Sequence, residues 1–116
     1  MDPVEKSEIK SFLDDFKIKL KTYGIIFKNR EKNIQGLLDL DIRPFQREEY
    51  LLNLKVEDYF DGPKRDSFDS DSPDYWEFGI MIKKTQVYIK ISLWKFKKVL
   101  CISFHPAEQK MKFPYK

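Results

Sequence analysis

The stretch YWEFGIMIKKTQVYIKISLWKFKKVLCISFH, residues 75–105, alternates apolar and polar side chains in three runs. A period of two is typical of half-buried strands, so the sequence predicts strands over Tyr75–Ile82, Gln86–Leu93 and Val99–His105. The connections at 83–85 and 94–98 are short, whereas neighbouring parallel strands need a long crossover. We therefore expect the three strands to form an antiparallel meander.

One face of this meander is apolar and the other carries reactive groups. The apolar face is predicted to hold Trp76, Phe78, Ile80, Ile82, Val87, Ile89, Ile91, Leu93, Leu100, Ile102 and Phe104. The opposite face is predicted to hold Tyr75, Glu77, Gly79, Tyr88, Lys90, Ser92, Val99, Cys101, Ser103 and His105. Pairing Ile91 with Ile102 gives a register in which Tyr88 lies opposite His105 and position 90 opposite position 103. A slip of two residues would keep the faces and change the partners.

The length of 116 residues predicts one domain, 1–116, with residues 1–54 mainly helical and 75–105 forming the sheet. The expected class is α+β, with N-terminal helices packed on a small antiparallel sheet. Charged residues make up 35% of the chain and no apolar run approaches membrane-spanning length, which predicts a soluble protein with no membrane contact. The charged start, Met1–Lys10, does not resemble a signal peptide, and the lone Cys101 cannot form an internal disulfide. These features predict a cytoplasmic protein.

Charge is distributed unevenly along the chain. Residues 57–77 carry two basic and eight acidic groups, whereas residues 78–116 carry nine basic groups and one acidic group. A concentrated positive field suits a polyanionic partner. The alternative interpretation is that several of these lysines are solvated strand ends that protect a sheet edge.

The first helix is predicted from Ser7 to about Lys21, since apolar residues recur there at intervals of three and four. Ser7 is the expected N-cap, and Gly24 the expected residue after the helix. Ile25–Phe27 fits either a short strand or a linker.

Two further helices are predicted before the sheet. Asn33 is expected to cap a short helix over Ile34–Asp39. Asp41 or Arg43 is expected to open a third helix, with Pro44 in its first turn. All three helices are expected to cover the sheet.

The segment between the helices and the strands is polar. Val56–Phe60 fits either a helix end or a short strand, and Asp61-Gly62-Pro63 has the composition of a turn. Residues 64–74 are expected to form a flexible acidic loop. Its aspartates lack the glycine and terminal glutamate of a calcium loop, so we expect no metal and no cofactor. The tail, 106–116, is expected to lie against the body through Phe113 and Tyr115.

The polar face suits one reaction class, which is metal-independent cleavage of RNA. The chain has no nucleophile elbow, zinc cluster or phosphate-binding glycine loop. Attack of a ribose 2′-OH on the neighbouring phosphate needs proton carriers and cations. His105 can move protons, Lys90 supplies positive charge, Tyr88 can donate to a phosphate or stack on a base, and Glu77 can act as a base or orient the histidine. Each of these side chains also has a purely structural interpretation as a packed or solvated strand residue.

The same region resembles the MqsR toxins, the motility quorum-sensing regulator family. Val87-Tyr88-Ile89-Lys90-Ile91 and Val99-Leu100-Cys101-Ile102-Ser103-Phe104 look like the last two strands of that family. Leu54-x-x-Glu57-Asp58-Tyr59-Phe60 is similar to a family segment of the form L-x-x-S-D-F-Y, and Tyr75-Trp76-Glu77 falls where the family has tryptophan followed by glutamine. The resemblance covers roughly residues 54–105. It implies a RelE-like α+β fold, metal-independent cleavage of messenger RNA on or off the ribosome, and neutralisation by an antitoxin protein.

The resemblance also implies roles for single residues. The catalytic tyrosine of the family falls on Tyr88, its glutamine on Glu77, and its C-terminal lysine on His105. Its upstream lysine falls near Asp61, which departs from the pattern, and Lys64 or Arg65 could replace it.

The sequence thus predicts a bacterial toxin of a type II toxin–antitoxin system, acting as an endoribonuclease. The expected catalytic residues are His105, Tyr88, Glu77 and Lys90. The expected RNA-binding residues are Lys64, Arg65, Lys83, Lys84, Lys110 and Lys112. The alternative is a module of the same fold that binds protein or RNA without cutting.

Overall fold

The computed structural model describes residues 4–65, 73–93 and 98–116. The elements of the described chain are, in order, α1 (Lys6–Tyr23), β1 (Ile25–Phe27), α2 (Glu31–Leu40), α3 (Gln46–Leu52), the 3₁₀ helix η1 (Val56–Asp58), β2 (Tyr59–Lys64), β3 (Tyr75–Ile82), β4 (Thr85–Leu93) and β5 (Val99–Pro106). The expected α+β class is confirmed, and so are the three strands expected between residues 75 and 105.

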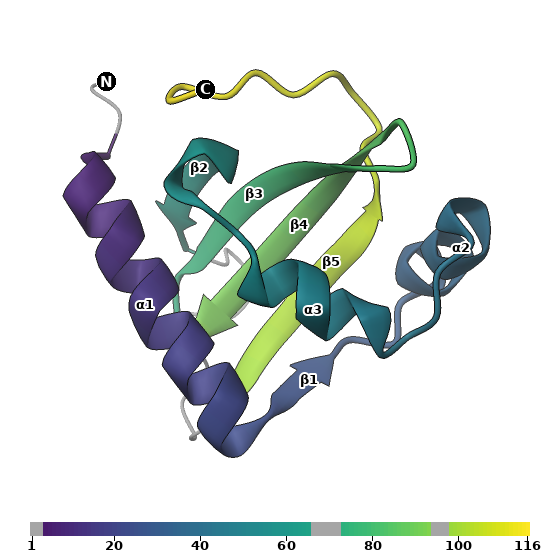
Figure 1. Ribbon diagram of the computed structural model, residues 1–116, viewed down its shortest axis with the longest axis horizontal. Coiled ribbons are helices and arrows are strands. Elements are labelled where there is room, and N and C mark those ends of the chain that lie inside the picture. The colour runs from purple at the N-terminus through teal and green to yellow at the C-terminus, as the bar shows by residue number, and fades with distance from the viewer. Residues whose placement is uncertain (1–3, 66–72, 94–97) are drawn as a thin grey trace.

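The sheet is mixed and has the strand order β1-β5-β4-β3-β2. The pairs β2–β3, β3–β4 and β4–β5 are antiparallel, whereas β1 pairs in parallel with β5, so the sheet is not wholly antiparallel as expected. Ile25–Phe27 is therefore a strand and not a linker. Figure 1 shows β1 beside β5 at one edge of the sheet, with α1 and α3 crossing one face.

The core lies between this helical layer and the sheet. The apolar stripe of α1 is buried as expected, and Phe12 stacks on Trp76 with ring centroids 4.5 Å apart. Phe78, Ile89 and Phe104 from three adjacent strands are almost wholly buried beneath the helices. Burial of these side chains stabilises the packing of the helices on the apolar face of the sheet.

Two predicted helix caps are wrong. Glu5, and not Ser7, precedes the first turn of α1, although Gly24 does end the helix at φ +89°. Asn33 lies inside α2, which begins earlier than expected, after Arg30. The third helix, α3, begins only at Gln46.

The expected turn at 61–63 is also wrong, because these residues belong to β2. β2 pairs irregularly with β3, with register shifts on both sides of Asp61. Gly62 adopts φ +112°, and a Cβ there would lie 3.0 Å from the carbonyl oxygen of Tyr75. A glycine is thus required at this position. After the second register shift, Lys64 pairs with Tyr75, the first residue of β3.

A β-bulge at Ile102 corrects the predicted faces of β5. Ile91 pairs with Cys101 and not with Ile102, whereas Lys90 pairs with Ser103. The extra residue reverses the alternation, so Val99 and Cys101 lie in the core and not on the polar face. The expected pairing of Tyr88 with His105, on the far side of the bulge, is confirmed.

The tail after β5 packs on the body, as expected. Phe113 meets Phe60 edge-on at 6.3 Å between ring centroids, and the hydroxyl of Tyr115 donates a hydrogen bond to the carbonyl of Val4. No helix in the described residues is long and apolar enough to span a membrane.

Candidate active site

A chain of contacts crosses the polar face of the sheet, with one residue from each of four adjacent strands. Lys64 Nζ on β2 lies 2.7 Å from Glu77 Oε1 on β3. The hydroxyl of Tyr88 on β4 donates a 2.6 Å hydrogen bond to Glu77 Oε2. The Tyr88 ring meets the imidazole of His105 on β5 at 5.6 Å between centroids. Three predicted catalytic residues, at 77, 88 and 105, are therefore brought together.

Glu77 is the buried centre of this chain, with only 6% of the residue exposed. Its Oε1 has no well-aligned hydrogen-bond donor in the described residues, but the Lys64 ammonium lies close enough to pair with its charge. Burial, together with the hydrogen bond to the Glu77 carboxylate, raises the pKa of Tyr88 far above its usual range. Tyr88 therefore keeps its proton and directs it to Glu77.

Lys64 is held between two carboxylates. Its Nζ lies 2.8 Å from Asp61 Oδ2 as well as 2.7 Å from Glu77 Oε1. These two partners raise the pKa of Lys64, with Asp61 contributing most. The lysine is thus a fixed cation that neutralises Glu77. It is one of the two residues, with Arg65, that are expected to replace the upstream lysine of the MqsR pattern.

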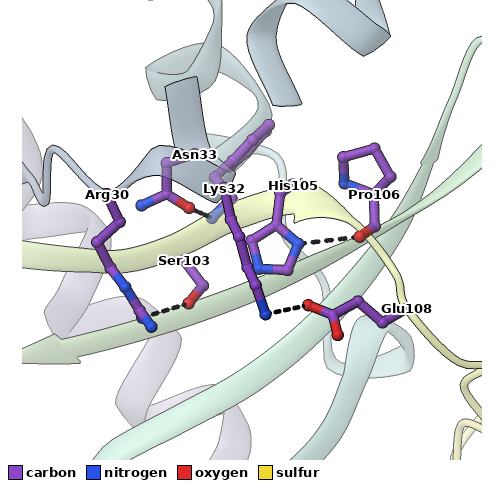
Figure 2. Close-up of polar contacts among 8 residues, drawn as sticks. Arg30, Lys32, Asn33, Ser103, His105, Pro106 and Glu108 are labelled. Atoms are coloured by element: carbon purple, nitrogen blue, oxygen red, sulfur yellow. Dashed lines mark hydrogen bonds and ion pairs between the residues drawn. The ribbon is translucent and has the colours of Figure 1, made fainter. Parts of the chain in front are cut away.

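His105 is buried, with 8% of the residue exposed. Its Nδ1 lies 2.9 Å from the carbonyl oxygen of Pro106. A carbonyl can only accept, so this bond places the proton on Nδ1 and leaves the lone pair of the neutral ring on Nε2. Figure 2 shows this second ring nitrogen on the side of the ring away from Pro106. His105 is therefore oriented as a proton acceptor.

Helix α2 fixes the backbone beneath this imidazole. A Cβ at Gly36 would lie 3.0 Å from Cα and Cβ of His105, so the helix contacts the strand directly. The Asn33 amide donates to the carbonyls of Lys28 and Ile102 and accepts from the N–H of Phe104. Asn33 thereby provides hydrogen-bond partners for backbone groups at the edge of β5. These groups lie beside the bulge, beyond the point where β1 stops pairing with β5.

A cavity of about 350 Å³ opens in front of Tyr88 and His105. Its lining consists of Arg30, Lys32, Phe60, Tyr88, Lys90, Ser103, His105, Ala107, Glu108, Gln109, Lys110 and Met111. Four of these residues are Lys or Arg and one is acidic, so the cavity favours an anion. Lys90 Nζ also lies 3.9 Å from the centroid of the Tyr75 ring.

Two cations of the cavity, Arg30 and Lys32, are absent from the residues expected to bind RNA. Arg30 Nη1 donates to the hydroxyl of Ser103 at 3.4 Å, and Lys32 Nζ lies 2.5 Å from Glu108 Oε1 (Figure 2). Their signal in the sequence is the charged segment around the start of α2, with Arg30 just before the helix and Lys32 in its first turn. It points to the site only once β1 is known to pair with β5.

The remaining predicted RNA-binding residues are spread more widely. Lys110 lines the cavity, whereas Arg65, Lys84 and Lys112 are exposed and do not line it. Lys83 in the β3–β4 turn donates to the carbonyl oxygen of Asp41 at 2.6 Å, also outside the cavity lining.

Within residues 4–65, 73–93 and 98–116, no group of three or more His, Cys, Asp or Glu side chains is placed to hold a metal ion. Three aspartates of the predicted acidic loop, at 66, 69 and 71, lie outside the described residues.

The sequence matches no protein-family model, and no curated protein and no solved structure is significantly similar to it.

Proposed function

We propose that the protein is a metal-independent endoribonuclease of the toxin type, with His105 as its proton acceptor. The observation that carries the proposal is the orientation of His105, whose Nδ1 contacts the carbonyl of Pro106, which leaves Nε2 as the acceptor of the neutral ring. The residue lines a cavity together with Arg30, Lys32, Lys90 and Lys110. A ribose 2′-OH beside a phosphodiester is a substrate that needs both features.

The reaction is a transesterification. His105 Nε2 takes the proton of the 2′-OH, the 2′ oxygen bonds to the neighbouring phosphorus, and the bond from phosphorus to the 5′ oxygen breaks. The products are a 2′,3′-cyclic phosphate and a 5′ alkoxide, which takes a proton from solvent. Arg30 and Lys90 stabilise the negative charge that develops on the phosphate oxygens.

Tyr88 and Glu77 have positioning roles in this proposal. Because the Tyr88 hydroxyl donates to Glu77, its proton is not directed at the substrate. The phenol ring instead supports the imidazole and offers an aromatic surface to a base. Glu77, neutralised by Lys64, fixes the phenol.

The resemblance to the MqsR toxins supports the biological part of the proposal. Tyr88 and Glu77 meet each other, as do Tyr88 and His105, at three positions to which that resemblance assigns catalytic roles. We propose messenger RNA in the bacterial cytoplasm as the substrate and an antitoxin protein as the partner that blocks cleavage.

The test is incubation of the purified protein with mixed-sequence single-stranded RNA in the presence of EDTA. We expect fragments with cyclic-phosphate and 5′-hydroxyl ends, and none from the same sequence as DNA. The variant His105→Asn retains an amide that can donate to Pro106 but has no atom equivalent to Nε2. If folded His105→Asn cuts RNA as fast as the parent, His105 is not the proton acceptor.

A second candidate is a module that binds RNA without cutting it. The observation that favours it is the ion pair between Lys64 and Glu77. This pair puts a neutralised carboxylate where the MqsR resemblance places a glutamine. RNA that is bound by the parent but recovered intact, with and without ribosomes, would select this candidate. Growth arrest on expression in bacteria, relieved by His105→Asn, would select the nuclease.

A further inference from the structure

His105 lies between two cavities, which meet at one ion pair. A second cavity of about 440 Å³ is lined by Glu31, Lys32, Gln35, Asp39, His105, Pro106 and Glu108. It shares Lys32, His105 and Glu108 with the first cavity. The contact between Lys32 and Glu108 therefore marks the boundary between the two spaces.

This ion pair joins two segments that are distant in the sequence. Lys32 belongs to the first turn of α2 and Glu108 to the tail after β5, with Nζ and Oε1 2.5 Å apart. Figure 2 shows the lysine side chain running beside the His105 imidazole to reach the glutamate. Both side chains are more than half exposed, at 62% and 61%. Exposed ion pairs contribute little to stability, so this contact can open at small cost.

The two cavities differ in charge. Arg30, Lys90 and Lys110 line only the first, whereas Glu31 and Asp39 line only the second. A phosphate group is attracted to the first and repelled from the second. Carboxylates and an amide can accept hydrogen bonds from base edges, so the second cavity suits a nucleobase.

We infer that the Lys32–Glu108 ion pair closes the path of a single RNA strand across His105, and that Lys32 leaves Glu108 to bind a backbone phosphate of that strand. This inference rests on the proposed function. In the bound state one nucleotide places its phosphate in the first cavity, the next base occupies the second, and the 2′-OH between them faces His105. Glu108 holds the site closed when RNA is absent.

The first test removes the charge of Glu108. The probe is a fluorescent single-stranded RNA that is fully 2′-O-methylated, so that binding is measured without cleavage. Glu108→Gln should bind this probe about two- to fivefold more tightly than the parent, because Lys32 no longer has a competing carboxylate. The matched control is Asp14→Asn, which breaks the exposed Lys10–Asp14 pair on α1 and removes the same charge outside either cavity lining.

The second test removes the charge of Lys32. Lys32→Gln should weaken binding about two- to fivefold and reduce the slope of log affinity against log salt by about 0.7, the value for one phosphate contact on a single strand. Lys10→Gln is its matched control. If Lys32→Gln instead tightens binding as Glu108→Gln does, Lys32 only holds the pair closed and the phosphate contact is wrong.

The outcomes separate this inference from the proposed function. If the parent cuts RNA but Glu108→Gln and Lys32→Gln bind like their controls, the nuclease stands and the closed path is wrong. If Glu108→Gln binds the probe more tightly and Lys32→Gln more weakly, but no protein cuts RNA, the inferred RNA path is supported and the nuclease proposal is wrong. Failure of every variant to bind the probe overturns the path.

Discussion

Tyr88 donates its hydroxyl proton to Glu77 across the β3–β4 pair, at a distance of 2.6 Å. This bond turns the phenol away from a direct proton transfer to substrate and gives it the task of holding a buried carboxylate. The carboxylate is in turn neutralised by Lys64 on the next strand. Tyr88, Glu77 and Lys64 thus stabilise the polar face of the sheet, and their effect on stability can be measured separately from RNA cleavage.

Tyr88→Phe should lower the free energy of unfolding by about 1.5–3 kcal/mol, because a hydrogen bond to a buried charge is lost and nothing replaces it. Urea unfolding gives the value. Glu77→Gln should cost less, since its amide oxygen still accepts from Tyr88 and the buried charge is removed. A larger loss for Glu77→Gln than for Tyr88→Phe would contradict this account of the pair.

Stability should fall as the pH rises above 10. The pKa of Tyr88, ordinarily 10.0, is raised in the folded state by burial and by Glu77. The unfolded state therefore loses this proton first, so the stabilisation is complete below pH 10 and is lost as the pH rises toward the folded pKa. Urea midpoints of the parent and of Tyr88→Phe should converge above pH 10. A constant difference between them would show that Tyr88 does not carry the effect.

Gly36→Ala should displace the His105 strand, because Gly36 of α2 contacts the backbone of His105. Alanine favours helices by about 1 kcal/mol over glycine, but its Cβ would lie 3.0 Å from the backbone of His105. Helix α2 must then move, and we expect a net loss of about 1–3 kcal/mol in stability. Cleavage should fall at the same time, because the imidazole moves with its strand. Leu38→Ala, on the exposed part of α2, is the control and should change neither thermal unfolding nor cleavage.

Much of this site follows from the alternation in the sequence, and its failures have local causes. Tyr88 and His105 were paired correctly because both lie on the same side of the bulge at Ile102. The alternation predicts the wrong face for Val99 and Cys101 because the bulge at Ile102 interrupts the period of two. Asn33, from a helix distant in sequence, bonds the backbone of Ile102 and Phe104 at this point. Such a contact leaves no mark in the periodicity of the strand.

The cations of the cavity were found only in part for a similar reason. Lys90 lies on β4 and Lys110 in the tail, close in sequence to Tyr88 and His105 respectively. Arg30 and Lys32 reach the cavity only because the three residues of β1 pair in parallel with β5. A strand this short has no reliable pattern of its own, so its partner could not be inferred.

Asn33→Ala should be strongly destabilising, although the residue lies in a helix where alanine is favoured. Its side chain makes three hydrogen bonds to the backbone of residues 28, 102 and 104. Each buried group left without a partner costs about 1–3 kcal/mol. Amide hydrogen exchange should show the N–H of Phe104 losing protection. Unchanged protection there would mean that water replaces the asparagine.

Arg30→Gln should separate the cavity from the general positive charge of the protein. Arg30 lines the cavity and contacts Ser103, whereas Lys83 lies outside the lining and contacts Asp41. Both substitutions remove one positive charge, so any effect of net charge is the same for each. Binding of non-cleavable RNA should weaken several-fold for Arg30→Gln, with a salt slope lower by about 0.7, and should change little for Lys83→Gln. Equal losses of RNA affinity in the two variants would show that RNA is held by the overall positive field of the protein. The cavity would then not be the phosphate-binding site.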